Sequence, residues 1–330
     1  MLRIPFADVA STLSTILVGV GFDSSRAEPC ARLFAETTRD GIYSHGIERF
    51  PRFLETIRNR TVDVHAAPRR IHELGAIERW DGRRGPGNLN AWSSMARAIE
   101  LGRQHGIGCV ALSNTNHWMR GGTYGWQAAD AGFIGVCWTN TLANLPPWGA
   151  SAPALGNNPL IIAVPRPAGH VILDMAMSQF SYGALEAFRR KGQLLPVDGG
   201  FDSAGNLTRD PATIEGSQRP LPIGYWKGSG LAMMLDMVAA LLSGGLATHQ
   251  IPLEPAKESG LSQVFLTFDL SRMQPSEESA HAADAIVDSV LAGNPGAVRY
   301  PGQQVLKTRA ENLALGLPVR EELWNELRRV

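Results

Sequence analysis

Apolar residues recur at intervals of three and four in the first forty residues, which is typical of the buried face of an amphipathic helix. The first such series covers residues 6–20. A second helix is expected from residue 24 or 25 to residue 39, because the serines at its start are favourable N-cap residues. Residues 43–50 are then expected to enter a further short helix that runs toward residue 58. The chain therefore begins with a helical section.

Beyond residue 70 the pattern changes to short apolar runs bounded by glycine, proline or asparagine, which are typical of buried strands. Helical periodicity returns between several of these runs. Residues 66–70 carry a proline and two arginines and are expected to form a crossover between two lobes. The alternation of strands and helices predicts a mixed α/β protein. The expected strands cover residues 77–80, 107–113, 133–140, 160–164, 171–175 and 263–270, and the expected helices cover residues 88–105, 182–191, 230–242, 276–291 and 319–330.

Length and charge narrow the classes of function. With 330 residues the chain is longer than a single hydrophobic core usually supports, so two or more lobes are expected. Its 31 basic and 31 acidic residues cancel, and no run of lysine or arginine stands out. A nucleic-acid-binding surface is therefore not expected, and an anionic ligand has to be met by a few local cations.

The cysteines and the apolar stretches argue against a secreted or membrane-bound protein. Cys30, Cys109 and Cys137 are odd in number and lack CxxC spacing, which favours free thiols in a reducing cytoplasm. The N-terminal apolar stretch contains Asp8 and lacks the features of a cleavable signal, and residues 231–242 are too few to span a bilayer. The histidines show no HxxxH spacing, so no metal site is assigned.

A dinucleotide, if one binds, has to bind without the usual fingerprint. The Rossmann fold carries GxGxxG between a strand and a helix, and the chain does not contain this pattern. Residues 226–230, Trp-Lys-Gly-Ser-Gly, are the better phosphate candidate, because free amides at a helix start attract anions and Lys227 would add a charge. The alternative is an ordinary helix capped by Ser229, with a solvated lysine.

Ser44, His45 and Arg49 form the most informative cluster. On a helix His45 and Arg49 would be neighbours on one face, because they are four residues apart. Reduction of a 2-oxo acid needs a proton donor for the carbonyl oxygen and a cation for the carboxylate, and histidine and arginine suit these tasks. The alternative is a helix-capping histidine beside a surface arginine.

Two further positions place polar groups at the end of, or inside, an expected strand. His117 lies in a loop rich in polar and aromatic residues, where it could orient a substrate or merely satisfy a carbonyl group. Asp174 lies within an apolar strand, where an ionised carboxylate is costly without a partner. We expect Asp174 to pair with a histidine or a cofactor, or to accept backbone amides at the end of the strand.

Taken together, these segments resemble the malate/L-lactate dehydrogenase family, whose non-Rossmann fold is also called sulfolactate dehydrogenase-like. The resemblance runs nearly end to end, and so many long segments in one order are far more specific than a single short motif. The segments that carry it are YSHGIERFPRF, LGAIERWD, NHWMRGGTYGWQAA, CWTNTLANLPPWGA, GNNPLIIAVP, LDMAMSQFSYG, LPVDGGFDSAGNLT and GYWKGSGLAMMLDM.

The resemblance implies hydride transfer between NADH, or alternatively NADPH, and a small 2-oxo acid, with His45 as the proton donor. It also implies a homodimer whose cofactor site involves both subunits. Ser44, Arg49 and His117 are expected to bind the substrate, because of their charge and placement. The residues expected to contact the cofactor are His170, Val171, Ile172, Leu173, Asp174, Met175, Ala176, Trp226, Lys227, Gly302, Gln303 and Gln304.

The sequence leaves the substrate and the cofactor preference open. Gln303 and Gln304 stand where the family pattern has a histidine and an acidic residue, which bears on the choice between NADH and NADPH. Alternative substrates are lactate, malate, an ureidoglycolate-like hydroxy acid or a cyclic imino acid, and the alternative outside the enzymes is a carboxylate-binding protein without activity. We expect residues 1–72 and 300–330 to form a helical lobe for substrate binding and dimerisation, and residues 73–299 a mixed-sheet lobe for cofactor binding and catalysis.

Overall fold

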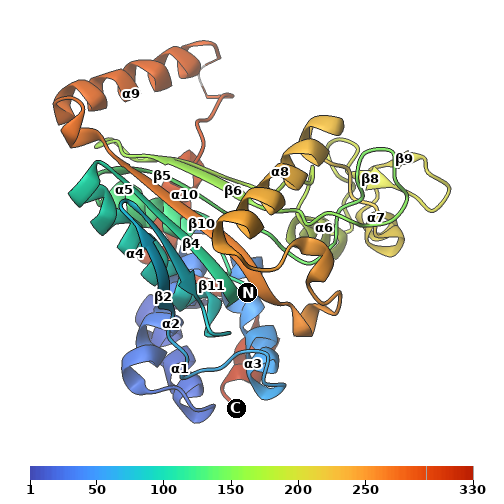
Figure 1. Ribbon diagram of the computed structural model, residues 1–330. Coiled ribbons are helices and arrows are strands. Elements are labelled where there is room, and N and C mark those ends of the chain that lie inside the picture. Colours follow the sequence, from blue (N-terminus) through green and yellow to red (C-terminus); the bar gives the residue numbers. More distant parts are fainter. Residues whose placement is uncertain (295, 330) are drawn as a thin grey trace.

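The computed structural model describes residues 1–294 and 296–329, which form a helical part, a central sheet and a smaller unit beside the sheet (Figure 1). Val330, at the end of the expected terminal helix, lies outside the described residues. The helical part combines both ends of the chain. Its elements are β1 (Leu2–Ile4), α1 (Phe6–Gly19), α2 (Ser24–Arg39), the 3₁₀ turns η1 (Tyr43–His45) and η2 (Ile47–Arg49), α3 (Phe50–Arg58), β11 (Leu317–Val319) and α11 (Glu321–Leu327).

The helical part has a core of its own. The apolar faces of α1, α2 and α3 meet there, with Leu13, Phe34 and Phe53 all buried. Trp324 of α11 packs into the same core, and β1 pairs antiparallel with β11. Residues more than 300 positions apart in the sequence are therefore neighbours, and both termini lie on this side of the molecule (Figure 1).

A seven-stranded mixed sheet forms the centre of the molecule, in the order β2-β3-β4-β10-β5-β6-β7. Only β3 and β4 are parallel, and the other neighbouring pairs are antiparallel. This order is not that of a doubly wound parallel sheet, so the prediction of a mixed, non-Rossmann α/β fold is confirmed. The strands are β2 (Arg69–Leu74), β3 (Ile77–Asp81), β4 (Ile107–Asn116), β5 (Phe133–Thr139), β6 (Leu160–Val164), β7 (Val171–Met175) and β10 (Ser259–Asp269).

Helices cover both faces of this sheet. On one face α4 (Gly87–His105) and α5 (Gly122–Asp130) bury Met95 and Tyr124 against Phe265 of the central strand β10. On the other face α8 (Trp226–Ser243) packs Ala232 and Leu235 against the sheet. The alternation of side chains along β10 explains this arrangement, because successive residues of a strand point to opposite faces.

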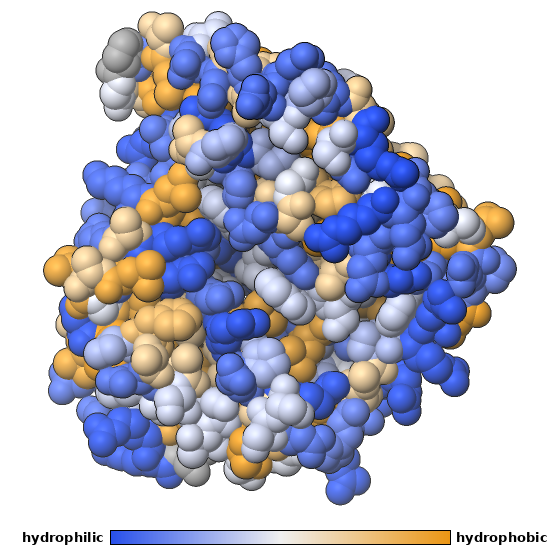
Figure 2. Space-filling model, turned by 90° about the vertical axis from the view of Figure 1, so that its left-hand side faces the viewer, coloured by the Kyte–Doolittle hydropathy of each residue, from blue (hydrophilic) through white to orange (hydrophobic). Residues whose placement is uncertain are grey.

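A small unit and two further helices complete the chain. The small unit has its own core of Leu185, Leu195 and Ile214, while α9 (Ser276–Ala292) extends away from the body of the molecule (Figure 1). The side that carries α9 is mainly hydrophilic, with scattered apolar side chains, and is hollowed near its middle (Figure 2). Among the described residues we find no helix with the length and apolar character needed to cross a membrane. These elements are α6 (Tyr182–Arg190), β8 (Gly200–Phe201), β9 (Leu207–Thr208), α7 (Pro211–Ser217), η3 (Thr248–Gln250), η4 (Pro255–Lys257), η5 (Leu270–Arg272), α9 (Ser276–Ala292) and α10 (Gln303–Leu315).

The expected strands and helices are present, with corrections at three places. Residues 66–70 are not only a crossover, because β2 begins at Arg69. The end of the chain is not one helix, since β11 precedes α11. Helix α8 begins at Trp226 rather than at residue 230, so the Trp-Lys-Gly-Ser-Gly segment forms its first turn and is not a loop.

The prediction that His45 and Arg49 share one helical face is wrong. Two 3₁₀ turns replace the expected helix, and between them Gly46 adopts φ −94° and ψ −130°. A Cβ at Gly46 would lie 2.3 Å from Thr38 Oγ1, so only glycine lets the chain pass this close to α2. Thr38 Oγ1 accepts a hydrogen bond from the Ile47 N–H at 2.8 Å, and this contact fixes the bend.

Candidate active site

A cavity of about 730 Å³ lies where the turn η1, the end of β7 and helix α6 meet. Ser44 and His45 of η1 form part of its wall, and His117 and Arg120 come from the segment that follows β4. Asp174 of β7 lies in the same wall. The structure thus brings together side chains from three separate regions of the sequence, as a binding site for a small molecule requires.

His45 lines the cavity, and one of its two ring nitrogens is engaged by its neighbour Ser44. The Oγ atom of Ser44 lies 3.0 Å from His45 Nδ1, and Nε2 makes no hydrogen bond to a described residue. Gly183 of α6 packs directly on this pair, since a Cβ there would lie 2.6 Å from Ser44 Oγ. This packing leaves Nε2 of His45 free to exchange a proton with a ligand.

A second imidazole stacks on His45. The ring centroids of His45 and His117 are 5.9 Å apart, with 24° between the ring planes. Nδ1 of His117 accepts a hydrogen bond from the Met119 N–H at 3.0 Å, so the neutral ring carries its proton on Nε2. His117 can therefore donate a hydrogen bond, which suits an acceptor such as a carboxylate or carbonyl oxygen.

Burial and nearby arginines keep both rings uncharged in the free protein. Burial, followed by the charges of Arg49 and Arg120, lowers the pKa of His45 to about 4. The pKa of His117 is lowered well below its usual range by burial and then by Arg49, His45 and Arg52. An anionic ligand would offset the arginine charges and raise the pKa of His45, which favours the protonated ring once the ligand is bound.

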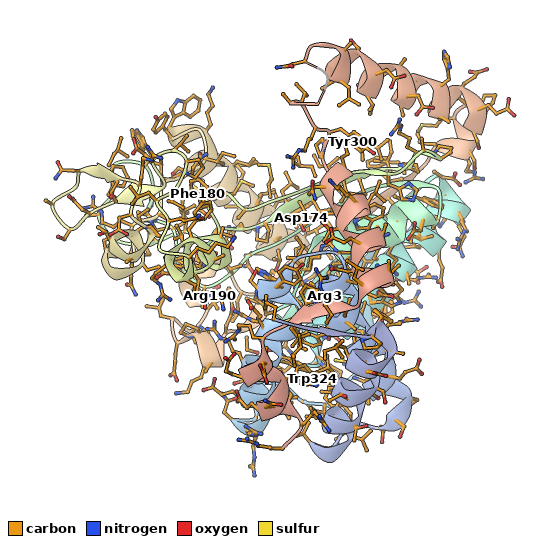
Figure 3. The ribbon with its side chains drawn as sticks, turned by 180° about the vertical axis from the view of Figure 1, so that it is seen from behind. Arg3, Asp174, Phe180, Arg190, Tyr300 and Trp324 are labelled. Atoms are coloured by element: carbon orange, nitrogen blue, oxygen red, sulfur yellow. The ribbon has the colours of Figure 1, made fainter. Side chains whose placement is uncertain are left out.

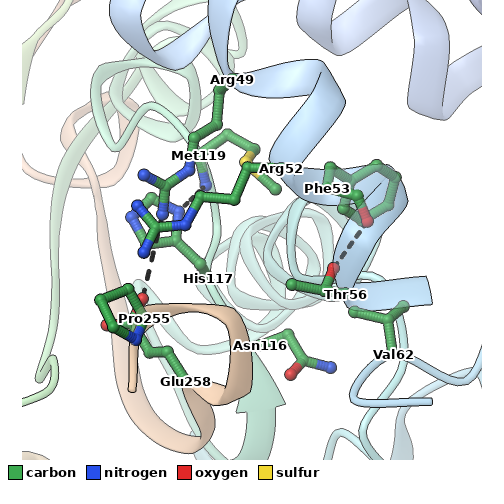
Figure 4. A pocket seen from close by; sticks show the side chains of 10 residues that line it. All are labelled: Arg49, Arg52, Phe53, Thr56, Val62, Asn116, His117, Met119, Pro255 and Glu258. Carbon is green, nitrogen blue, oxygen red and sulfur yellow. Dashed lines mark hydrogen bonds and ion pairs between the residues drawn. The ribbon is translucent and has the colours of Figure 1, made fainter. Parts of the chain in front are cut away.

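Arg49 lines a smaller pocket that shares His117 with the main cavity (Figure 4). Its guanidinium extends beside that of Arg52, and its Nη2 atom is 4.0 Å from Glu258 Oε2. The guanidinium of Arg49 makes no hydrogen bond within the part of the chain that the structure describes. The pocket measures about 20 Å³, which is room for one water molecule, so a carboxylate could enter only if side chains moved.

Arg120 belongs to a buried ionic cluster behind the cavity wall. Its Nη1 atom donates to Asp40 Oδ2 at 2.6 Å, and the same carboxylate accepts hydrogen bonds from Arg39 at 2.8 Å and from Arg309 at 2.7 Å and 2.8 Å. Burial alone would raise the pKa of Asp40, but the hydrogen bonds and charges of Arg309, Arg120 and Arg39 outweigh it and lower the pKa to about 2. The cluster therefore holds one carboxylate ionised among three guanidinium groups.

Asp174 lies at the end of β7, between the part of the chain with Phe180 and the segment with Tyr300 (Figure 3). Its Oδ2 atom accepts a hydrogen bond from the Gly122 N–H at 2.8 Å and is 3.9 Å from Arg120 Nε. Burial raises its pKa, while Arg120 and the amide of Gly122 oppose the change. The expectation that this carboxylate accepts a backbone amide is confirmed.

Two of the segments expected to contact a cofactor lie side by side. The N–H of Ile172 in β7 donates to Pro301 O at 3.0 Å, just before Gly302. Gly302 has φ +92°, and a Cβ there would lie 3.1 Å from the Ile172 nitrogen, so glycine is needed for this approach. The side chains of Gln303 and Gln304 bond to the Tyr300 N–H and to Arg299. Residues 170–176 and 302–304 therefore lie against each other, and the first segment ends at the cavity, where Asp174 and Ala176 lie in the wall.

Trp226 and Lys227, the third expected segment, do not line this cavity. They are exposed at the start of α8, and the N–H groups of residues 227, 228 and 229 already donate to carbonyl groups of residues 224, 223 and 225. Ser229 does not cap the helix, because its Oγ atom accepts the Trp148 N–H at 3.0 Å instead. The prediction of free amides at this helix start is wrong for these three residues.

Sequence reasoning did not assign Arg120, Arg52 or Glu258 to the site. Arg120 stands within a segment that was expected to bind a ligand, and its two following glycines were a usable signal for a close approach to another strand. No local sequence pattern connects Glu258 to Arg49. The arrangement as a whole brings an imidazole with one unpaired ring nitrogen and hydrogen-bond donors for an anion to a cavity of about 730 Å³.

Comparison with known proteins places this chain among related enzymes. The malate/L-lactate dehydrogenase family matches residues 4–328. The chain is 45% identical over 330 residues to 2,3-diketo-L-gulonate reductase of Escherichia coli K12, with 99% of each chain covered. Sulfolactate dehydrogenase from Methanocaldococcus jannaschii superposes with a TM-score of 0.91 at 25% identity, over 99% of this chain and 96% of that one. The delta1-piperideine-2-carboxylate reductase from Pseudomonas syringae pv. tomato gives 0.89 at 26% identity, over 100% and 99%.

Proposed function

The chain belongs to the malate/L-lactate dehydrogenase family, and from this premise we propose that it reduces 2,3-diketo-L-gulonate at the 2-keto group to give 3-dehydro-L-gulonate. Membership of this family of dehydrogenases and reductases implies a nicotinamide cofactor. The observation that carries the proposal is the shared cavity, in which His45 and His117 lie in one wall with Asp174 and Ala176 at the end of β7. A cofactor held along β7 would end beside the proton donor.

The chain's own residues would then position the substrate and supply the proton. When bound, the reduced nicotinamide supplies the hydride for carbon 2. The substrate carboxylate lies toward His117 and Arg49, and the 2-keto oxygen lies at Nε2 of His45, with Ser44 orienting the ring at Nδ1. The negative carboxylate offsets the charge of the arginines, so the pKa of His45 rises and its ring gains a proton when the substrate binds. His45 then gives this proton to the keto oxygen, which becomes a hydroxyl group.

For the cofactor itself we propose NADH, held by residues 170–176 and 302–304 of one subunit. Recognition of NADPH needs a free cation for its extra phosphate. Arg166 and Arg299, which lie beside the turn at Gly302, are already paired with Asp284 and Gln304. Gln303 and Gln304 add no charge of their own. These contacts favour the cofactor without the phosphate.

A spectrophotometric panel tests the proposed reaction. Oxidation of NADH and of NADPH is followed separately with 2,3-diketo-L-gulonate, pyruvate, oxaloacetate and a cyclic imino acid. We expect the highest kcat/KM with 2,3-diketo-L-gulonate and NADH. Faster turnover of any of the other three would move the chain to a different substrate within the family, and the absence of turnover with all of them would refute the activity.

Helix α8 supports a homodimer. Trp226, Met233, Met237 and Leu241 form an exposed apolar stripe at helical spacing, and they are 66%, 48%, 47% and 77% exposed. The opposite face of the same helix packs on the sheet, so α8 is apolar on both sides. A helix that is apolar all round is normally buried. We propose that a second copy of the chain covers this stripe, and that Trp226 and Lys227 reach the cofactor of the partner subunit.

A charge in this stripe should separate the subunits. We expect Leu241→Glu to convert the dimer to a monomer in sedimentation velocity at micromolar concentration, because the carboxylate would be buried without a partner. The control is Val18→Glu, which places the same charge on an exposed apolar position of α1 and should leave the dimer intact. A wild-type chain that sediments as a monomer would refute the proposed assembly.

The cysteines bear on the location of the enzyme. Cys30, Cys109 and Cys137 are free and buried, and burial raises the pKa of Cys30 to about 12 and that of Cys109 to about 11. Such thiols are stable without disulfides in a reducing compartment. They support our proposal that the enzyme works in the cytoplasm.

A further inference from the structure

Arg120 has donor groups that the protein does not use. Its side chain is 4% exposed, yet it contributes to the wall of the main cavity. Nη1 is bonded to Asp40, whereas Nε is buried and has no hydrogen-bond partner among the described residues, and Nη2 makes no hydrogen bond to them either. Nε is enclosed beside Gly122 and Asp174, so Nη2 is the donor left for a ligand in the cavity. Buried polar groups of proteins are nearly always paired, so this unused donor indicates a ligand that accepts from it.

The guanidinium of Arg120 is also fixed in position. Asp40 holds it from behind, and Asp40 is itself held by Arg39 and Arg309 from the end of α2 and from α10. Gly122 closes the gap toward Asp174, because a Cβ there would lie 2.6 Å from Asp174 Oδ2 and 3.1 Å from Arg120 Nε. A donor that is held from several sides loses little freedom when a ligand binds, and this favours selectivity.

Arg120 and Arg49 face different parts of a substrate bound at His45. Both charges act on His45, but Arg49 lies in the small pocket behind His117 and Arg120 lies in the wall of the main cavity. Carbon 2 of a 2-oxo acid carries the carboxylate on one side and carbon 3 on the other. With the 2-keto oxygen at His45 and the carboxylate toward His117 and Arg49, carbon 3 comes to the side of Arg120.

We propose that Arg120 is a specificity-determining residue that donates a hydrogen bond to the oxygen on carbon 3 of a 2,3-dioxo acid. The inference rests on the proposed function. A simple 2-oxo acid such as pyruvate has a methyl group at carbon 3 and would leave the buried donor unpaired. A site built around such a donor discriminates strongly against the analogue that lacks the acceptor.

The test compares two variants on two substrates. In Arg120→Met we expect the ratio of kcat/KM for 2,3-diketo-L-gulonate over pyruvate to fall roughly ten- to hundredfold, the usual range for loss of a hydrogen bond to a charged group. The matched control is Arg39→Met, which also removes one partner of Asp40 but does not line the cavity. We expect the control to keep the wild-type ratio, and NADH affinity to be unchanged in both variants.

Three results would overturn the proposal. An equal loss of the ratio in Arg39→Met would show that Arg120 acts only through the ionic cluster. An equal loss of kcat/KM on both substrates in Arg120→Met would assign Arg120 to the carboxylate instead of carbon 3. If Arg120→Met does not fold, the double variant Arg120→Met with Asp40→Asn, which also removes the carboxylate that loses its partner, is compared with Asp40→Asn alone. An equal ratio in these two variants would equally refute the role.

A failure of the proposed function can be told apart from a failure of this inference. If the wild-type enzyme turned over neither acid, the proposed reaction would be refuted. Calorimetry with L-gulonate, which has an oxygen on carbon 3, and with L-lactate, which has none, would then decide the role of Arg120. Arg120→Met should weaken L-gulonate binding roughly ten- to hundredfold and leave L-lactate binding unchanged, and a variant that binds both as the wild type does would refute the inference.

Discussion

Replacing His45 by alanine should lower kcat for the 2-oxo acid by roughly two to four orders of magnitude, the usual contribution of general acid catalysis. The variant loses the imidazole that lines the cavity beside Ser44 and whose Nε2 makes no hydrogen bond to a described residue. We expect NADH to bind to His45→Ala nearly as to the wild type, because β7 and the turn at Gly302 are unaffected. The measurement is single-turnover oxidation of NADH, combined with fluorescence titration of the cofactor.

The control for this variant is a histidine outside the cavity. His65 has a side chain that is 67% exposed, and His65→Ala should retain wild-type kcat. A His45→Ala enzyme with kcat within a few fold of the wild type would show that another group delivers the proton.

The dependence of the reaction on pH should be steep, because the free enzyme holds His45 neutral. Burial and the charges of Arg49 and Arg120 lower the pKa of His45 to about 4. Reduction needs the protonated ring, whose fraction falls as pH rises above that pKa. The kcat/KM for reduction, which reports the free enzyme, should therefore fall roughly tenfold per pH unit between pH 5 and pH 8. The corresponding fall in kcat should begin at higher pH, since the bound carboxylate raises the pKa of His45.

The reverse reaction provides an internal control. Oxidation of the hydroxy acid needs His45 as a base in its neutral form, which is already the dominant form from pH 5 upward. We expect kcat/KM for oxidation to be nearly independent of pH over the same range. A donor with the ordinary histidine pKa would give a different pattern below about pH 6.5. There kcat/KM for reduction would be independent of pH, and kcat/KM for oxidation would decrease as the pH is lowered. That outcome would contradict the electrostatic description of the site.

The fold was predictable where a side-chain pattern reflects burial on one face. The periodicity of residues 6–20 and the apolar run at 133–140 correspond to α1 and β5 almost residue for residue. β2 was missed because all six of its residues are exposed at the edge of the sheet, and α10 because only Asn312 of its residues is buried. β1 and β11 pair across more than 300 residues, and three-residue strands carry no local signal.

The candidate site was predictable in its residue types but not in its three-dimensional contacts. Histidine 45 stood out because imidazole suits proton transfer near neutral pH. The helix that was to place Arg49 beside it is interrupted at Gly46, where contact with Thr38 decides the backbone. Arg120 and Arg309 both bond to Asp40, from which they are 80 and 269 residues away in the sequence. This cluster could therefore be found only in the structure. The catalytic and cofactor roles assigned to individual residues stay predictions.

A crystal structure of the enzyme with NADH and oxamate tests the central claim most directly, because oxamate resembles a 2-oxo acid but is not reduced. We predict that its amide oxygen lies within hydrogen-bond distance of His45 Nε2, roughly 3 Å, with the carboxylate toward His117 and the nicotinamide at the end of β7. A complex in which the amide oxygen contacts another donor, while His45 is out of reach of both oxamate and the nicotinamide, would contradict the account.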